Sequence, residues 1–370
     1  KKLNVPNSTD KGNVIRNVPH LRFPEFEGEW EKCKFKDVCN ISTGNKNTQD
    51  KADDGIYPFY VRSQTVERIN SWTFDGEAIL TAGDGVGVGK VFHHSYGKIG
   101  VHQRVYILSD FKCDANYLFH FFSSKFYNRV KRMSAKNSVD SVRKEMITDM
   151  PLSLPCHKEQ VQIGHMLSLL DERIATQSKI IEDLKKLKSA ISENLFKEVK
   201  GDVVMLSEIC EISKGKQING EFLSEKGKYY VMNGGTEPSG YYNNYNVEAN
   251  TISISEGGNS CGYVQFNTSP FWSGGHCYTI QEIADNVDNL YLYHFLKSKE
   301  DAIMKLRIGS GLPNIQKKDL AMFKIKIPTV EQQKAISTFL SSLERKAEIE
   351  ERIQNAMQKE KQYLLRQMFI

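Results

Sequence analysis

The sequence lacks long hydrophobic runs, paired cysteines and a secretory leader. No apolar stretch approaches the roughly 18 residues of a membrane span, and the opening KKLNVPNSTDKGNVIRN has no signal-peptide core. We therefore expect a cytoplasmic protein that contacts no membrane. The seven cysteines are an odd number without CxxC spacing, which predicts reduced thiols packed as small apolar side chains and no metal site.

Motifs of a catalytic centre are also missing. The sequence has no Asp/Asn-Pro-Pro-aromatic motif for base amino methylation, no S-adenosylmethionine loop, no Walker A motif and no carboxylate pattern of a nuclease. The motif GDGVGVGK at 83–90 resembles a dinucleotide-binding glycine loop, but it runs into the strand-like VFHH, whereas that fingerprint must open a helix. We expect no catalytic residues and no cofactor bound by the chain itself.

The most informative feature that is present is an internal repeat with a shift of about 173 residues. Gly85 and Gly89 of the first copy fall on Gly258 and Gly262 of the second, and similar matches extend along the chain. A period this long indicates a duplicated domain and not a solenoid of short units. The 370 residues, 39% of them hydrophobic, suffice for two cores. The net charge of +5 permits an anionic partner without requiring one.

Each copy begins strand-rich and ends in a long helix. Short runs rich in Ile, Val, Tyr and Phe alternate with Gly, Asn and Asp before Pro155 and again before Pro328. This pattern predicts strands and turns, with one helix near 116–130. The predicted segments are an N-terminal arm at 1–29, a first domain at 30–155, a first spacer helix at 156–200, a second domain at 201–328 and a second spacer helix at 329–370.

The two predicted spacer helices carry a heptad seam, in which apolar residues recur at alternating steps of four and three. In the first helix eight of the ten seam positions are apolar, and Gln177 and Lys188 are the exceptions. These positions are 163, 167, 170, 174, 177, 181, 184, 188, 191 and 195. The second seam lies 173 residues further on, and seven of its ten positions are apolar.

Connectivity predicts how the helices pair. Only about four residues join the end of the first helix to the second domain, so the end of the first helix should lie beside the start of the second. We therefore predict an α+β protein in which two similar mixed α/β domains are separated by two long antiparallel coiled-coil helices with pseudo-twofold symmetry. Two inverted domains at a fixed separation suit recognition of a bipartite site on double-stranded DNA.

Two pairs of divergent loops supply the candidate DNA contacts. The glycine loop 83–90 corresponds to 255–264, and the cationic segment 131–146 corresponds to 305–320. Their polar residues and those around them offer donors and acceptors to phosphates and base edges. The candidates are Lys46, Arg62, Asp84, Lys90, Arg104, Lys136, Asn137 and Arg143 in the first copy, and Lys214, Asn233, Thr236, Glu256, Asn259, Ser260, Arg307, Ser310, Asn314 and Lys317 in the second. Tight hairpins with incidental polar residues, and solvated surface charge, remain open as alternatives.

Four histidines recur as pairs. His102 falls on His276 and His120 falls on His294 at a shift of 174. A residue kept in both copies is better suited to supporting the shared fold than to reading different sequences. We interpret all four as structural.

Several longer stretches resemble the specificity subunit of type I restriction-modification systems. They are the arm PHLRFPEFEGEW, the opening WEKCKFKDVCNISTG, the run from MNGGTEPSGYY to GGHCYTI, the loop GSGLPNIQKKDL and the helix entry IPTVEQQKAISTFLSSLE. The resemblance covers nearly the whole chain and implies two target-recognition domains, each reading one half of a split DNA site. It also implies two modification subunits, which carry S-adenosylmethionine and methylate adenine N6, and restriction subunits that use ATP and Mg.

Two other classes remain open at this point. One is a non-catalytic adaptor or scaffold whose coiled coil binds proteins, and the other is a DNA methyltransferase that acts alone. DNA affinity that falls steeply with salt would argue against the adaptor, because it indicates phosphate contacts. Methyl transfer by the isolated chain would favour the methyltransferase.

Overall fold

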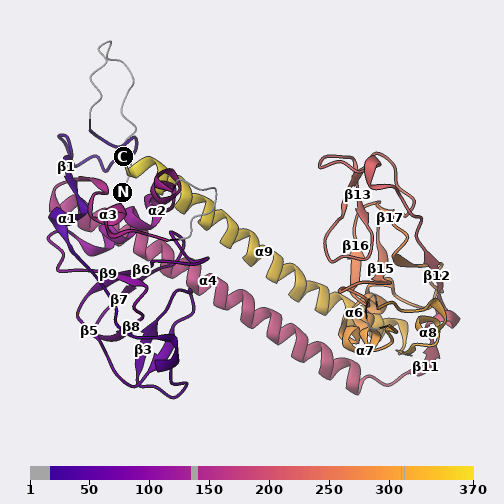
Figure 1. Cartoon of the computed structure of the whole chain (residues 1–370). Coiled ribbons are helices and arrows are strands. Elements are labelled where there is room, and N and C mark those ends of the chain that lie inside the picture. Colours follow the sequence, from indigo (N-terminus) through magenta and orange to yellow (C-terminus); the bar gives the residue numbers. More distant parts are fainter. Residues whose placement is uncertain (1–16, 135–140, 310, 312) are drawn as a thin grey trace, which may run out of the picture. The chain divides into compact units, whose positions relative to one another are not determined.

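The computed structural model divides the chain into two compact units, one of Lys1–Gln177 with Ile353–Ile370 and one of Ser178–Arg352 (Figure 1). Each unit contains one strand-rich segment and a part of both long helices. Within the described residues no helix is long and apolar enough to cross a membrane. The structure describes residues 17–134, 141–309, 311 and 313–370.

The first unit is built on two four-stranded sheets that share a core. The antiparallel sheet has the order β2 (Asn40–Thr43), β9 (Val105–Ser109), β6 (Ala78–Ala82) and β7 (Phe92–Ser95). The second sheet has the order β4 (Glu67–Ile69), β3 (Tyr57–Tyr60), β8 (Lys98–Val101) and β5 (Phe74–Asp75), with β3 and β8 parallel. A two-stranded ribbon and short helices complete it: β1 (Glu31–Lys34), β10 (Pro151–Leu154), α1 (Phe35–Val38), a 3-10 turn (Thr48–Asp50), α2 (Ala115–Met133) and α3 (Lys144–Thr148).

Strand β6 explains why both faces of the antiparallel sheet are buried. Successive side chains of a strand point to opposite faces. Ile79 accordingly joins the core that contains α2, whereas its neighbour Leu80 joins the core between the two sheets. All five residues of β6 are therefore buried.

The second unit repeats this plan, and β5 has no counterpart among its described residues. Its antiparallel sheet has the order β12 (Glu211–Lys214), β18 (Cys277–Gln281), β15 (Thr251–Ser255) and β16 (Val264–Asn267). The smaller sheet has the order β14 (Gly240–Tyr242), β13 (Tyr229–Met232) and β17 (Trp272–Ser273), with β13 and β17 parallel. The remaining elements are β11 (Asp202–Met205), β19 (Lys324–Ile327), α5 (Leu206–Ile209), a 3-10 turn (Gly220–Phe222), α6 (Asn289–Ser298), α7 (Glu300–Met304) and α8 (Lys317–Ala321).

Two long helices follow the strand-rich segments, as the heptad pattern predicted. Helix α4 spans His157–Glu198 and α9 spans Val330–Met368. All twenty predicted seam positions are buried or partly buried. Between 172 and 190 every other residue of α4 is exposed, so the seam is the one protected stripe in that part of the helix.

The helices contact each other within both units. In the first unit Ile163, near the start of α4, shares a core with Met368 at the end of α9. In the second unit Phe196, near the end of α4, shares a core with Leu340 from the first part of α9. Aromatic contacts repeat this arrangement, because Phe369 packs on α2 and Phe196 packs on α6.

Matching ion pairs join the helices at positions 173 residues apart. Lys361 of α9 pairs with Asp171 of α4 in the first unit, and Lys188 of α4 pairs with Glu344 of α9 in the second. The two lysines occupy equivalent seam positions, and the two acids are also equivalent. Lys188 therefore interrupts the apolar seam with a partner on the other helix, as polar seam residues that fix register do.

The described part of the N-terminal arm, residues 17–29, has neither helix nor strand, as its prolines predicted. It is nevertheless packed against the first unit. Leu21 and Phe23 are buried in the core, and the Leu21 amide donates to the Gln367 carbonyl at 3.0 Å. Arg22 forms a bidentate pair with the fully buried carboxylate of Glu159, with both N–O distances 2.8 Å.

Candidate nucleic-acid interface

In the first copy three segments that are distant in sequence meet at the glycine loop. The Val142 amide donates to the Gly83 carbonyl at 2.7 Å, and Asp84 forms a bridge with Ser141. On the other side, the Gly83 amide donates to the Arg104 carbonyl at 2.7 Å. The loop after β6, the segment before α3 and the start of β9 therefore form one surface cluster. The candidates Lys136 and Asn137 lie outside the described residues.

The second copy makes the same three connections. The Ile315 amide donates to the Glu256 carbonyl at 2.8 Å, and Gly257 forms a bridge with Asn314. The Glu256 amide donates to the His276 carbonyl at 2.9 Å. The two predicted pairs of loops are thus brought together in both copies. The candidate Ser310 lies outside the described residues.

The glycines of these loops are explained by the turn. Gly85 and Gly258 both have φ of +76°, and Gly89 and Gly262 have φ of +65° and +93°. These left-handed conformations favour glycine over residues with a Cβ. The loop then enters β7, as predicted, and not a helix. For the glycines themselves the structure favours the hairpin interpretation over close approach to DNA.

In the first copy, Asp84 gathers two exposed arginines. Its Oδ1 lies 2.9 Å from Nη1 of Arg62, and its Oδ2 lies 3.7 Å from Nε of Arg104. Both guanidinium groups remain open to solvent on a depression also lined by Thr48, His102 and other polar residues. Exposed ion pairs contribute only about 0–1 kcal/mol to stability, so the main effect of Asp84 is to orient the two cations.

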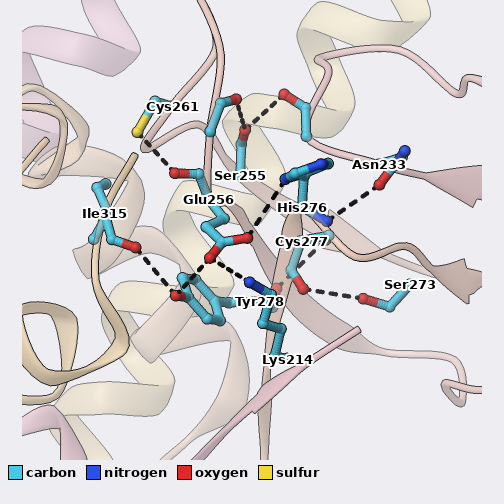
Figure 2. A network of polar contacts seen from close by, with 12 residues as sticks. Lys214, Asn233, Ser255, Glu256, Cys261, Ser273, His276, Cys277, Tyr278 and Ile315 are labelled. Carbon is cyan, nitrogen blue, oxygen red and sulfur yellow. Dashed lines mark hydrogen bonds and ion pairs between the residues drawn. The ribbon is translucent and has the colours of Figure 1, made fainter. Parts of the chain in front are cut away.

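In the second copy, Glu256 has the corresponding place but is buried (Figure 2). Its Oε1 lies 2.6 Å from Nζ of Lys214 and accepts a hydrogen bond from the Tyr278 hydroxyl at 3.1 Å. Its Oε2 lies 3.7 Å from Nδ1 of His276. Burial, and then the neighbouring Glu256 charge, raise the pKa of Tyr278 to about 12. The expectation that Glu256 itself offers an acceptor to DNA is therefore corrected: its carboxylate is below the surface and serves its neighbours.

Most other candidates lie on the surface, as a DNA-contacting role requires. Lys90 stands 5.4 Å from the centre of the Tyr127 ring, and Asn233 is partly buried, with its Oδ1 accepting from the His276 amide at 3.2 Å. Lys46 is partly buried and pairs through its backbone with His102. Ser260 is partly buried, and the fully exposed candidates are Arg143, Thr236, Asn259, Arg307, Asn314 and Lys317.

The predicted equivalence of His102 and His276 is wrong. His102 is buried, and its Nδ1 accepts from the Arg104 amide at 3.0 Å, whereas the side chain of His276 is 62% exposed. The backbone bonds align His276 with Arg104. The identity of two histidines at a shift of 174 concealed the better match at 172, which aligns Tyr106 with Tyr278. Sequence analysis therefore missed His276 as a candidate ligand-facing residue.

The structural interpretation of His120 and His294 is supported. Both rings are buried, and their Nε2 atoms pair with Ser168 of α4 and Ser341 of α9 at 3.1 and 2.9 Å. Burial lowers the pKa of His120 to about 3 and that of His294 to about 4. Both are therefore neutral at physiological pH and join a domain helix to a long helix.

The described residues contain no group of three His, Cys, Asp or Glu side chains that could hold a metal ion. All seven cysteines are free thiols, and six of them are buried or partly buried. Burial raises the pKa of Cys39 and Cys113 to about 12. These thiols pack as small apolar side chains, as the sequence predicted.

The fold and its paired clusters define a duplicated α+β protein with two polar, cation-bearing loop surfaces. The chain belongs to the family described as the type I restriction modification DNA specificity domain, whose model matches residues 27–186 and again 198–359. Each match contains one strand-rich segment and much of the helix that follows it. The family comparison therefore agrees with the internal repeat.

Individual relatives carry the same description. The chain is 26% identical over 159 residues to the type I restriction enzyme EcoDI specificity subunit of Escherichia coli, a match that spans 43% of this chain and only 35% of that protein. It is 26% identical over 409 residues to the MjaVIII specificity subunit of Methanocaldococcus jannaschii, covering 96% of this chain and 95% of that one. A crystal structure of a type I S subunit from M. genitalium has the same fold, with a TM-score of 0.73, 18% identity and coverage of 95% and 99%.

Proposed function

We propose that this chain recognises a bipartite site on double-stranded DNA and directs adenine-N6 methylation and restriction by partner subunits. The observation that carries the proposal is the duplicated three-segment cluster, in which an acid orients two cations from other segments. Cations on an exposed surface suit phosphates and base edges. The clusters share a backbone frame and differ in side chains, as two readers of different half-sites should.

The same proposal assigns the two strand-rich domains, 30–155 and 201–328, to one half-site each. We infer that α4 and α9 form an antiparallel coiled-coil spacer between them, related by a pseudo-twofold axis. Two features support this arrangement: the Lys361–Asp171 and Lys188–Glu344 pairs recur at equivalent positions, and each helix end packs against the other helix's start. A rigid spacer would fix the distance between half-sites.

We further infer that the chain provides specificity and not catalysis. Two modification subunits would supply S-adenosylmethionine and transfer the methyl group, and restriction subunits would use ATP and Mg. This division rests on the family to which the chain belongs and on the absence of methyltransferase and nuclease motifs from the sequence.

Transfer of tritiated methyl groups to DNA tests this function. The chain, its modification subunits and their mixture are each incubated with S-adenosylmethionine and DNA that contains the site. We expect incorporation only with the mixture, and affinity of the complex that falls steeply with salt because cations contact phosphates. Incorporation by the chain alone, or by the modification subunits without it, would contradict the proposal.

A further inference from the structure

Arg104 and His276 occupy the same place in the two copies. The carbonyl of each accepts a hydrogen bond from the first residue of the glycine loop, at 2.7 Å from Gly83 and 2.9 Å from Glu256. Each residue immediately precedes the last strand of the antiparallel sheet, β9 or β18. Two residues later in each strand, a tyrosine hydroxyl donates to the carbonyl of Val142 or Ile315.

The two side chains also have the same surroundings. Arg104 is 66% exposed and His276 is 62% exposed. A nitrogen of each lies 3.7 Å from a carboxylate oxygen of the adjacent loop. The acids are Asp84 in the first copy and Glu256 in the second. The longer side chain of Glu256 reaches its partners from a buried position.

Glu256 is built to position its neighbours. Lys214 and Tyr278 occupy its Oε1, while no hydrogen bond to Oε2 is present among the described residues. That buried oxygen faces Nδ1 of His276, whose backbone amide is fixed by Asn233 (Figure 2). One edge of the imidazole is thus turned toward the protein, and Nε2 is the ring nitrogen left for a ligand.

We infer that His276 reads a base in the half-site of the second domain, and that Glu256 is the residue that positions it; the inference rests on the proposed function. A side chain held by its neighbours suits base readout, which requires fixed geometry. Nε2 can make one hydrogen bond to a base edge. The guanidinium of Arg104 in the first copy can instead donate two bonds to guanine.

A selection from double-stranded DNA with both half-sites randomised tests the inference, using the full chain in complex with its modification subunits. We expect H276A to lose about 5- to 150-fold of its discrimination at one base pair of one half-site, as for loss of a good base contact. The other half-site should be unchanged. H276R should favour guanine at that base pair, and H276Q serves as a second variant that keeps a polar side chain.

Two further variants separate the roles. The control H157A removes another exposed histidine, at the start of α4, and should leave both half-sites unchanged. E256Q should weaken preference at the base pair that H276A affects, and the double variant should be no worse there than H276A, because the two residues act as a unit.

The outcomes distinguish the inference from the function beneath it. If the unmodified complex enriches no bipartite sequence, the proposed function and the inference both fail. If the complex does so and H276A keeps every base preference, or weakens all sequences equally, base readout by His276 is wrong while the function stands. An unchanged E256Q beside an altered H276A would overturn the positioning role of Glu256.

Discussion

The pair of Arg22 and Glu159 gives a stability test at the scale of single residues. Glu159 is fully buried and both of its oxygens accept from Arg22. Arg22→Ala should lower the free energy of unfolding by about 3–5 kcal/mol, because it leaves a buried carboxylate without its partner. Urea denaturation measures this. Lys34→Ala is the control, since its pair with Asp149 is exposed and should contribute less than about 1 kcal/mol. Equal effects of the two changes would contradict the burial argument.

Surface candidates are expected to affect only their own half-site. Removing Asn259 and Arg307 together should change recognition of one half of the DNA site, and removing Lys90 and Arg143 should change the other. Base contacts would each account for about 1–3 kcal/mol of discrimination, whereas phosphate contacts would lower affinity for all sequences. Selection from a randomised pool measures both effects, and indistinguishable profiles of the two variants would refute the assignment.

Residue types and spacing predicted which loops carry polar groups but not how those groups are used. Glu256 has the composition of a surface reader, yet the carbonyl of His276 and the amide of Ile315 hold its backbone beneath the surface. Contacts between residues 20 and 59 positions apart decide this. His276 was missed for a related reason, because identity alone aligned it with His102, whereas strand pairing aligns it with Arg104.

At the scale of elements, periodic patterns were the reliable part of the sequence. The heptad seam predicted α4 and α9, because an amphipathic helix is encoded by residues within a few positions of one another. The parallel pairing of β3 with β8 was not predictable in this way, since it joins Phe59 to Gly100 across an intervening chain. The same holds for the bridge between Asp84 and Ser141, which assembles the first cluster.

Disulfide crosslinking tests the pairing of the long helices. Cysteines are placed at Ile163 and at Leu364, Met368 or Ile336, in a background without the native cysteines. Because Ile163, Leu364 and Met368 share one core while Ile336 packs on the other, crosslinks from 163 should form at 364 or 368. Non-reducing electrophoresis reports them. Efficient crosslinking to 336 would indicate a parallel pair and contradict the proposed spacer.

At the scale of the whole molecule, the duplication predicts that residues 1–200 can form a twofold dimer. The first helix carries both members of the recurring ion pair, Lys188 and Asp171, so two copies can pair with each other. Phe196 can also take the place of its equivalent Phe369. Such a dimer would recognise an inverted repeat of the first half-site. Size measurements and mapping of methylated sites test this prediction. A half-chain that stays monomeric, or one that directs methylation to an asymmetric site, would contradict it.

The central claim is that this chain alone sets the DNA sequence at which its partners act. Sequencing that detects N6-methyladenine, in cells that contain the modification subunits with or without this chain, tests that claim directly. The account predicts one bipartite motif with a methylated adenine in each half, present only with the chain and altered in one half by R104A. The same motif without the chain, or methylation that follows no bipartite motif when the chain is present, would contradict it.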